Sequence, residues 1–61
     1  MTMTEMLIKD AKAIGASAVT VRQAEWGGWY VAILGGRVSQ IFGTQAEAQG
    51  AASEFIAKVA A

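Results

Sequence analysis

The chain has 61 residues, no net charge, and neither cysteine nor histidine, so we expect one domain without disulfides or thiolate metal sites. It lacks the basic excess that is usual in nucleic-acid binders, and no apolar run approaches the ~20 residues that span a bilayer. Its composition is 54% hydrophobic and 16% charged, which predicts that some apolar surface stays uncovered beside a marginal core.

The first helix is predicted over about residues 3–14. Thr2 and Glu5 have the spacing of a capping box, in which the threonine side chain bonds the backbone of the first turn. Apolar residues then recur at helical spacing, and Gly15 is a natural residue to end the helix.

Three strands joined by two tight turns are predicted next. A run rich in β-branched residues covers 18–26, and two apolar runs follow it at 29–34 and 37–42. Glycine pairs separate the three runs, at Gly27-Gly28 and at Gly35-Gly36. Glycine pairs favour type I′ hairpin turns, because both central residues of these turns have positive φ. The pattern therefore predicts an antiparallel meander.

The second helix is predicted over about residues 45–60, after a second capping box formed by Thr44 and Glu47. Its apolar stripe consists of Ala48, Ala51, Ala52, Phe55, Ile56 and Val59, with Phe55 as the expected core anchor. Residues 1–61 are thus expected to form a single α+β domain, ordered helix, three-stranded antiparallel meander, helix. Both helices should form a single layer on one face of the sheet.

Two-residue turns at the glycine pairs would fix which side chains share a face of the sheet. The expected cross-strand pairs are Trp26 with Trp29, Ala24 with Val31, Arg22 with Ile33, Leu34 with Arg37, Ala32 with Ser39 and Tyr30 with Ile41. The sequence leaves open which face the helices cover. The richer core candidate carries Val31, Ile33, Val38 and Phe42, and the opposite, partner-facing set is then Val19, Val21, Tyr30, Leu34 and Ile41.

The candidate partner-binding residues lie at the first turn and on this second face: Trp26, Trp29, Tyr30, Leu34, Arg37 and Ile41. The two tryptophans have two interpretations. They form either an aromatic binding platform or a cross-strand aromatic pair that stabilises the hairpin by ~0.2–1 kcal/mol.

No catalytic constellation is visible in the sequence. General acid–base catalysis most often uses histidine, which is absent, and Glu5 and Glu47 are explained as capping residues. None of the serines has an activating neighbour in the sequence. We therefore predict no enzymatic activity, no catalytic residue, no metal and no cofactor.

Two resemblances accompany these patterns. The helix–three strands–helix order, together with residues 43–52 (Gly-Thr-Gln-Ala-Glu-Ala-Gln-Gly-Ala-Ala), resembles the double-stranded RNA-binding domain and its final helix, although Gln45, Ala46 and Gln49 stand roughly where that family has lysines. Residues 29–52 are also similar to small uncharacterised bacterial and phage families that read Trp-x-Val, a glycine turn, then Thr-x-x-Glu-Ala. That second resemblance implies a β-meander with a packed helix and no settled activity.

The predicted function is stoichiometric protein binding by a cytoplasmic, non-enzymatic domain with no membrane association. The uncovered sheet face and the two sheet edges predict a homodimer. By analogy, such a protein would be a phage or mobile-element accessory protein that inhibits a host complex. The alternative is nucleic-acid binding through the Trp26/Trp29 hairpin with Arg22 and Arg37, which is disfavoured because two arginines make no wider basic patch.

Overall fold

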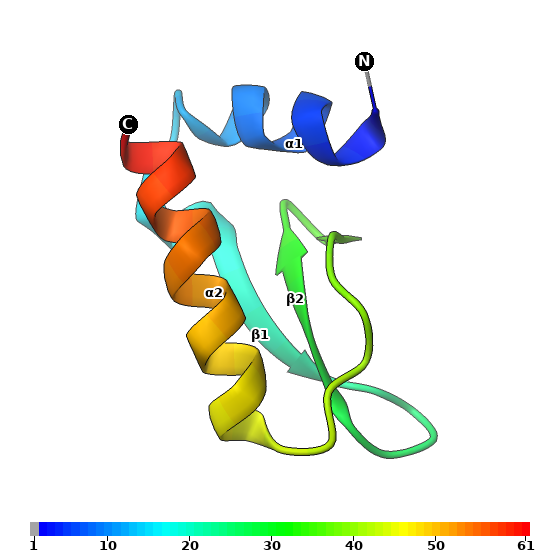
Figure 1. The fold of residues 1–61 in the computed structure, drawn as a ribbon. Coiled ribbons are helices and arrows are strands. Elements are labelled where there is room, and N and C mark those ends of the chain that lie inside the picture. Colours follow the sequence, from blue (N-terminus) through cyan, green and yellow to red (C-terminus); the bar gives the residue numbers. More distant parts are fainter. Residues whose placement is uncertain (1) are drawn as a thin grey trace.

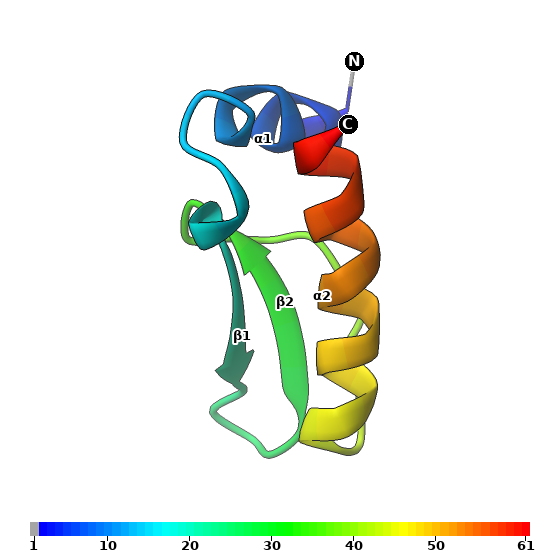
Figure 2. The same ribbon diagram turned by 90° about the vertical axis from the view of Figure 1, so that its left-hand side faces the viewer.

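The computed structural model describes residues 2–61, which form two helices and one three-stranded antiparallel sheet (Figure 1). The elements are α1 (Met3–Ala11), a 3-10 turn (Ala16–Ala18), β1 (Val19–Gln23), β2 (Trp29–Ile33), β3 (Gly36–Arg37) and α2 (Gln45–Ala60). The predicted α+β class and the order helix, three strands, helix are confirmed. α2 runs along one face of the sheet, and α1 crosses the end of this layer beside the C-terminus of α2 (Figures 1 and 2).

Both helices begin at the predicted caps. The Thr2 hydroxyl oxygen accepts a hydrogen bond from the Glu5 N–H at 3.2 Å, and Thr44 accepts one from the Glu47 N–H at 3.2 Å. The bounds predicted for α2 are confirmed, whereas α1 ends at Ala11 instead of residue 14. The N–H groups of Ile14 and Gly15 both bond to the Ala11 carbonyl, which tightens the chain into a turn. Ile14 is therefore left exposed.

The expected register between β1 and β2 is wrong. Arg22 lies opposite Tyr30 instead of Ile33, a shift of three residues, because residues 24–28 form the loop where a two-residue turn was expected. A shift by an odd number of residues turns a strand over, so every β1 side chain changes face relative to β2. Val19 and Val21 consequently lie beside Ile33 and Val31 on the side of α2. Val19 is a buried core residue and Val21 packs against the core, so neither belongs to the expected partner-facing set.

The second turn is also displaced. Its central residues are Leu34 and Gly35, with φ of 52° and 85°, so Ile33 pairs with Gly36 and Ala32 with Arg37 instead of Ser39. Both central residues have the positive φ of a type I′ turn, although the first is a leucine. The third strand is therefore much shorter than predicted, with two residues in place of 37–42.

Beyond β3 the chain follows β2 irregularly. The Val31 N–H donates to the Ser39 hydroxyl oxygen at 2.8 Å, where a regular ladder would use a backbone carbonyl. Further along, Trp29 and Phe42 exchange two backbone hydrogen bonds of 2.9 and 2.6 Å. Residues 38–42 therefore extend the sheet without forming a regular strand, and Tyr30 has no backbone pairing with Ile41.

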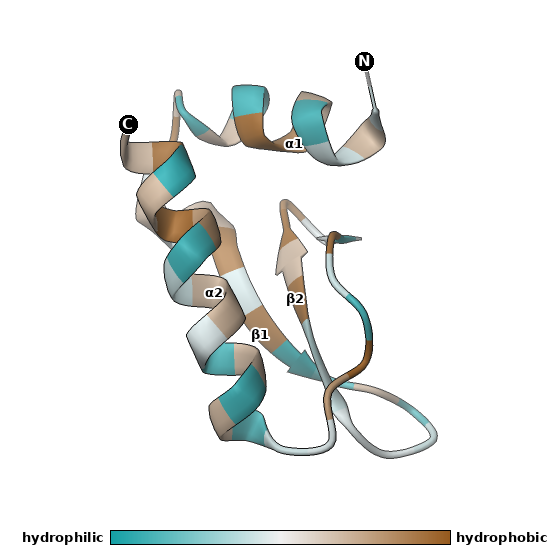
Figure 3. Cartoon of the chain, in the orientation of Figure 1, coloured by the Kyte–Doolittle hydropathy of each residue, from teal (hydrophilic) through white to brown (hydrophobic). Residues whose placement is uncertain are grey.

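The core lies between α2 and the sheet. Its buried members are Ala11, Ala18, Val19, Val31, Ile33, Ala52 and Val59, and Leu7, Ile8, Val38 and Ile56 pack around them. The predicted core positions Val31, Ile33 and Val38 are confirmed. Phe55 is only half-buried: it packs against the core under Lys58, whose Nζ lies 5.4 Å from the ring centroid. Hydrophobic and hydrophilic residues alternate along both helices, as the amphipathic pattern predicts (Figure 3).

Candidate functional site

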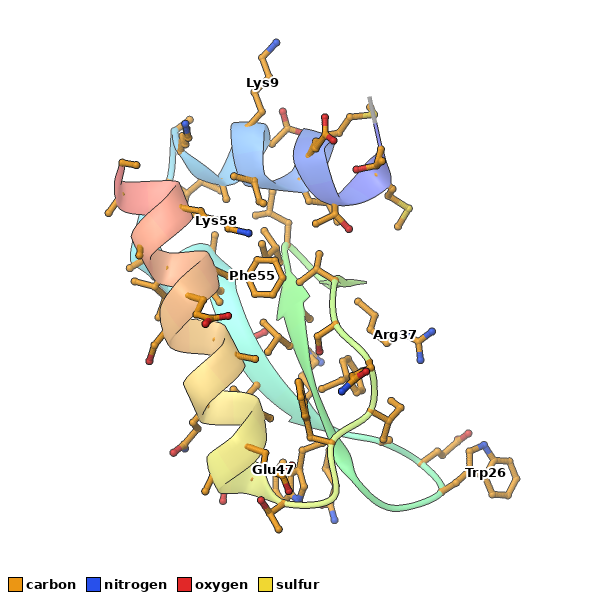
Figure 4. All side chains as sticks on the ribbon, in the orientation of Figure 1. Lys9, Trp26, Arg37, Glu47, Phe55 and Lys58 are labelled. Carbon is orange, nitrogen blue, oxygen red and sulfur yellow. The ribbon has the colours of Figure 1, made fainter. Side chains whose placement is uncertain are left out.

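The most exposed large apolar side chain among the described residues is Trp26, of which 93% is accessible. It lies in the loop of residues 24–28, and Figure 4 shows its ring pointing away from the domain. Two backbone hydrogen bonds define the loop: Ala24 N–H to the Gly28 carbonyl at 2.9 Å and Gly27 N–H to the Ala24 carbonyl at 3.1 Å. The loop therefore has a defined backbone that presents the indole to solvent.

Trp29 lies apart from this loop. It is half-buried at the start of β2, where its neighbours across the sheet are Gln23 and Phe42. The two tryptophans therefore do not form the cross-strand pair that was one interpretation of this motif. Nor do they form one aromatic platform, because Trp29 is fixed by the ladder and Trp26 is outside it.

The sheet face turned away from α2, called here the outer face, consists of Thr20, Arg22, Tyr30, Ala32 and Arg37. Arg22 lies directly opposite Tyr30, and Arg37 lies opposite Ala32 and therefore diagonal to Tyr30. No carboxylate belongs to these strand positions. The outer face thus carries one aromatic residue with an arginine opposite it and a second arginine diagonal to it, and not the apolar surface that the sequence predicts.

Leu34 and Ile41 lie at different places. Leu34 occupies the turn after β2 and is 44% exposed, whereas Ile41 is 43% exposed in the irregular segment. The Ile41 side chain closes on Gly28 at the base of the Trp26 loop. The six predicted binding residues therefore do not form one site. Trp26 and Ile41 lie at the loop, Tyr30 and Arg37 lie on the outer face, and Leu34 and Trp29 each lie elsewhere.

The sequence patterns missed the position of Arg22 beside Tyr30. The expected register placed Arg22 and Tyr30 on opposite faces, and only the length of the first loop brings them together. No composition or spacing in the sequence marks residues 24–28 as a five-residue loop, since Gly27-Gly28 is equally compatible with a two-residue turn.

Residues 2–61 show no pocket and no cluster of three or more acidic, histidine or cysteine side chains suited to a metal ion. Within the same residues, no helix has the length and apolarity needed to cross a bilayer. Comparisons with models of protein families, with curated proteins and with solved structures find no match to this chain. The candidate site therefore consists of surface features alone: the Trp26 loop and the outer face.

Proposed function

We propose that the chain is a non-enzymatic protein-interaction domain that binds its partner stoichiometrically, with Trp26 as the anchor residue. The observation that carries this proposal is the 93% exposure of Trp26 on a hydrogen-bonded loop. Tryptophan is among the residues most enriched at the energetic centres of protein interfaces. The phage accessory or inhibitor role, the cytoplasmic location and both family resemblances stay predictions.

An exposed tryptophan needs a reason, because burying this side chain removes ~150–250 Å² from water. A hairpin-stabilising role would supply one, but in the β1–β2 ladder Gln23, and not Trp26, lies opposite Trp29. The loop conformation depends instead on its backbone hydrogen bonds and on the positive φ of Gly27 and Gly28. The fold therefore does not depend on the Trp26 side chain, which is free to contact a partner.

The test replaces Trp26 with alanine and measures retention of partners. The immobilised parent, Trp26→Ala and Gln23→Ala proteins are exposed to an extract of the source cells, and retained proteins are quantified against bait. Gln23 is a matched control because it is exposed and close to the loop but outside it. We expect one protein, near equimolar with the parent bait, whose affinity falls at least ~30-fold with Trp26→Ala, as for a ≥2 kcal/mol hot spot. Equal retention by Trp26→Ala and the parent would contradict the proposal.

A second candidate function is supported by the outer face. Arg22 and Arg37 flank Tyr30 there, and single-stranded nucleic acids bind by phosphate contacts combined with base stacking on aromatic rings. This arrangement differs from the predicted one, since it uses Tyr30 and excludes both tryptophans.

This second function is tested with a fluorescent single-stranded RNA 12-mer and its duplex, by anisotropy over a series of salt concentrations. Two phosphate contacts predict a slope of log K against log salt near ~−1.4 for the single strand. Binding should vanish in the Arg22→Ala/Arg37→Ala double variant and persist in Trp26→Ala. If the parent does not bind at low salt, or the double variant binds as tightly as the parent, the outer face is not a nucleic-acid site.

A further inference from the structure

β1 is an edge strand whose outer side is unpaired. The sheet order is β1-β2-β3, so β1 has a neighbour on one side only. The ladder bonds at Ala18 and Ala24 show that even-numbered residues direct their backbone groups towards β2. The odd-numbered residues Val19, Val21 and Gln23 therefore direct theirs outwards. Of these groups, the Val19 N–H is bonded to the Ala16 carbonyl, and the others are directed away from the sheet.

Nothing in β1 protects this edge against pairing with another strand. Edge strands are usually protected by proline, lysine, an inward-pointing charge or a bulge. The β1 sequence is Val-Thr-Val-Arg-Gln, and it pairs continuously with β2 from Val19 to Gln23. Its single charge, on Arg22, belongs to the outer face and not to the edge itself. Val21 remains half-buried on the side of α2, at the margin of the core.

The flank of α2 above this edge is also free of charge. At 100° per residue, Glu47, Glu54 and Lys58 fall on one flank of the helix, on one side of the buried positions Ala52 and Val59. Lys58 covers Phe55 on the side of α2 that is turned towards β2, and Glu47 lies beside Gly43, so this charged flank faces away from the β1 edge (Figure 4). The opposite flank, which lies above the β1 edge, carries Gln49, Ser53, Ile56 and Ala60.

We infer that a second copy of this chain pairs antiparallel with β1, about a two-fold axis at Val21. In this register Val21 exchanges both backbone hydrogen bonds with Val21 of the second copy, and Gln23 N–H donates to the Val19 carbonyl of the second copy. Arg22 then lies opposite Thr20. Sliding the copies to the neighbouring paired register would set Arg22 directly against Arg22, which is destabilising for like charges. Sliding the copies the other way would pair Val21 with Val19, whose N–H is already bonded to the Ala16 carbonyl, so the register about Val21 is the favoured one.

The helices are compatible with this pairing. Because α2 contacts both β1 and β2, and strands lie ~4.8 Å apart, two copies of α2 would lie ~10 Å apart and antiparallel. That separation is close to the 8–10 Å typical of packed helices. The small side chains of Ser53 and Ala60 permit such an approach, and the half-exposed Val21 and Ile56 would become covered. The result is a continuous six-stranded sheet, formed independently of the Trp26 loop.

Sedimentation equilibrium over about 5–500 µM protein tests this inference. We expect the parent to exceed the 6.4 kDa monomer mass and to approach twice that value. Gln23→Pro removes an outward N–H from an exposed residue, and proline is tolerated at edge positions whose N–H faces solvent. We expect it to raise the dimer dissociation constant at least ~10-fold, with Gln23→Ala as its control.

A second variant keeps the test decisive if Gln23→Pro fails to fold. Ser53→Glu places two like charges near the two-fold axis, whereas Gln40→Glu adds the same charge on an exposed residue away from the edge. We expect Ser53→Glu to weaken the dimer at least ~10-fold and Gln40→Glu and Trp26→Ala to leave it unchanged. A parent that stays at 6.4 kDa throughout would overturn the inference, and so would a dimer unaffected by Ser53→Glu. Since Trp26→Ala tests partner retention alone, the two proposals fail separately.

Discussion

Replacing Ile33 with alanine is expected to remove about half of the domain's unfolding free energy. Ile33 is one of the two largest fully buried side chains, and it lies on β2 where the sheet meets both helices. Truncating a buried isoleucine to alanine typically costs ~2–5 kcal/mol, from lost burial and from the cavity left behind. At ~0.05–0.15 kcal/mol per residue, the whole domain has only ~3–9 kcal/mol of unfolding free energy.

Urea denaturation followed by circular dichroism measures this loss, and Ile41→Ala is the matched control. The control makes the same chemical change at a residue that is 43% exposed, so we expect it to cost ~1 kcal/mol or less. An Ile33→Ala protein that retains the parent's urea midpoint would show that β2 is not the centre of the core.

Gly28→Ala is expected to destabilise the domain by ~2–4 kcal/mol, and Gly27→Ala by only ~1 kcal/mol. Both glycines have positive φ, 85° and 96°, so both substitutions carry the strain of an L residue there. Only at Gly28 would the added Cβ meet neighbours, at 2.5 Å from Ile41 Cγ2 and 2.9 Å from the Phe42 carbonyl oxygen. That oxygen accepts the Trp29 N–H, so its displacement would weaken the Trp29–Phe42 pairing.

Both variants carry the strain of positive φ. The difference between their urea midpoints therefore measures the destabilisation that comes from the clash of the added Cβ at Gly28. A Gly28→Ala,Ile41→Ala double variant should recover part of the loss by removing Ile41 Cγ2. Equal destabilisation by the two single substitutions would mean that the 38–42 segment does not close on the base of the loop.

Local signals in the sequence predict the helices because each signal acts within one turn. Thr44 and Glu47 are three residues apart and form their contact wherever the helix packs, so the start of α2 follows from the sequence alone. Gly15 likewise marks the end of α1, although the helix ends earlier because its last turn tightens. The order of elements follows from the same local reasoning.

The strand register could not be predicted in the same way. Gly27-Gly28 permits a two-residue turn, but the observed five-residue loop sets Val19 and Val21 beside Val31 and Ile33 in the core. A two-residue turn would have turned Arg22 and Thr20 towards α2 instead. Burial of the valines therefore decides the register, and this depends on contacts between distant parts of the chain. The same register places Arg22 on the outer face, where Arg37 also lies.

The sequence predicted individual residues of the candidate site, but not how they are placed relative to one another. Trp26 stood out as an aromatic residue beside glycines, yet its exposure depends on a loop that the ladder leaves unpaired. Conversely, Tyr30 and Arg37 were assigned to one face correctly, because the displacement of the second turn preserves the alternation of side chains on β2 and β3.

The role of Trp26 in binding rather than folding is tested most directly by the unfolding free energies of Trp26→Ala and Trp29→Ala, measured side by side in urea. With 93% of its surface already in water, Trp26 should lose no more than ~0.5 kcal/mol on truncation. The half-buried Trp29, between Gln23 and Phe42, should lose more than ~1 kcal/mol. A loss above ~1 kcal/mol for Trp26→Ala would contradict this assignment, because it would show that the indole stabilises the hairpin and is not held free for a partner.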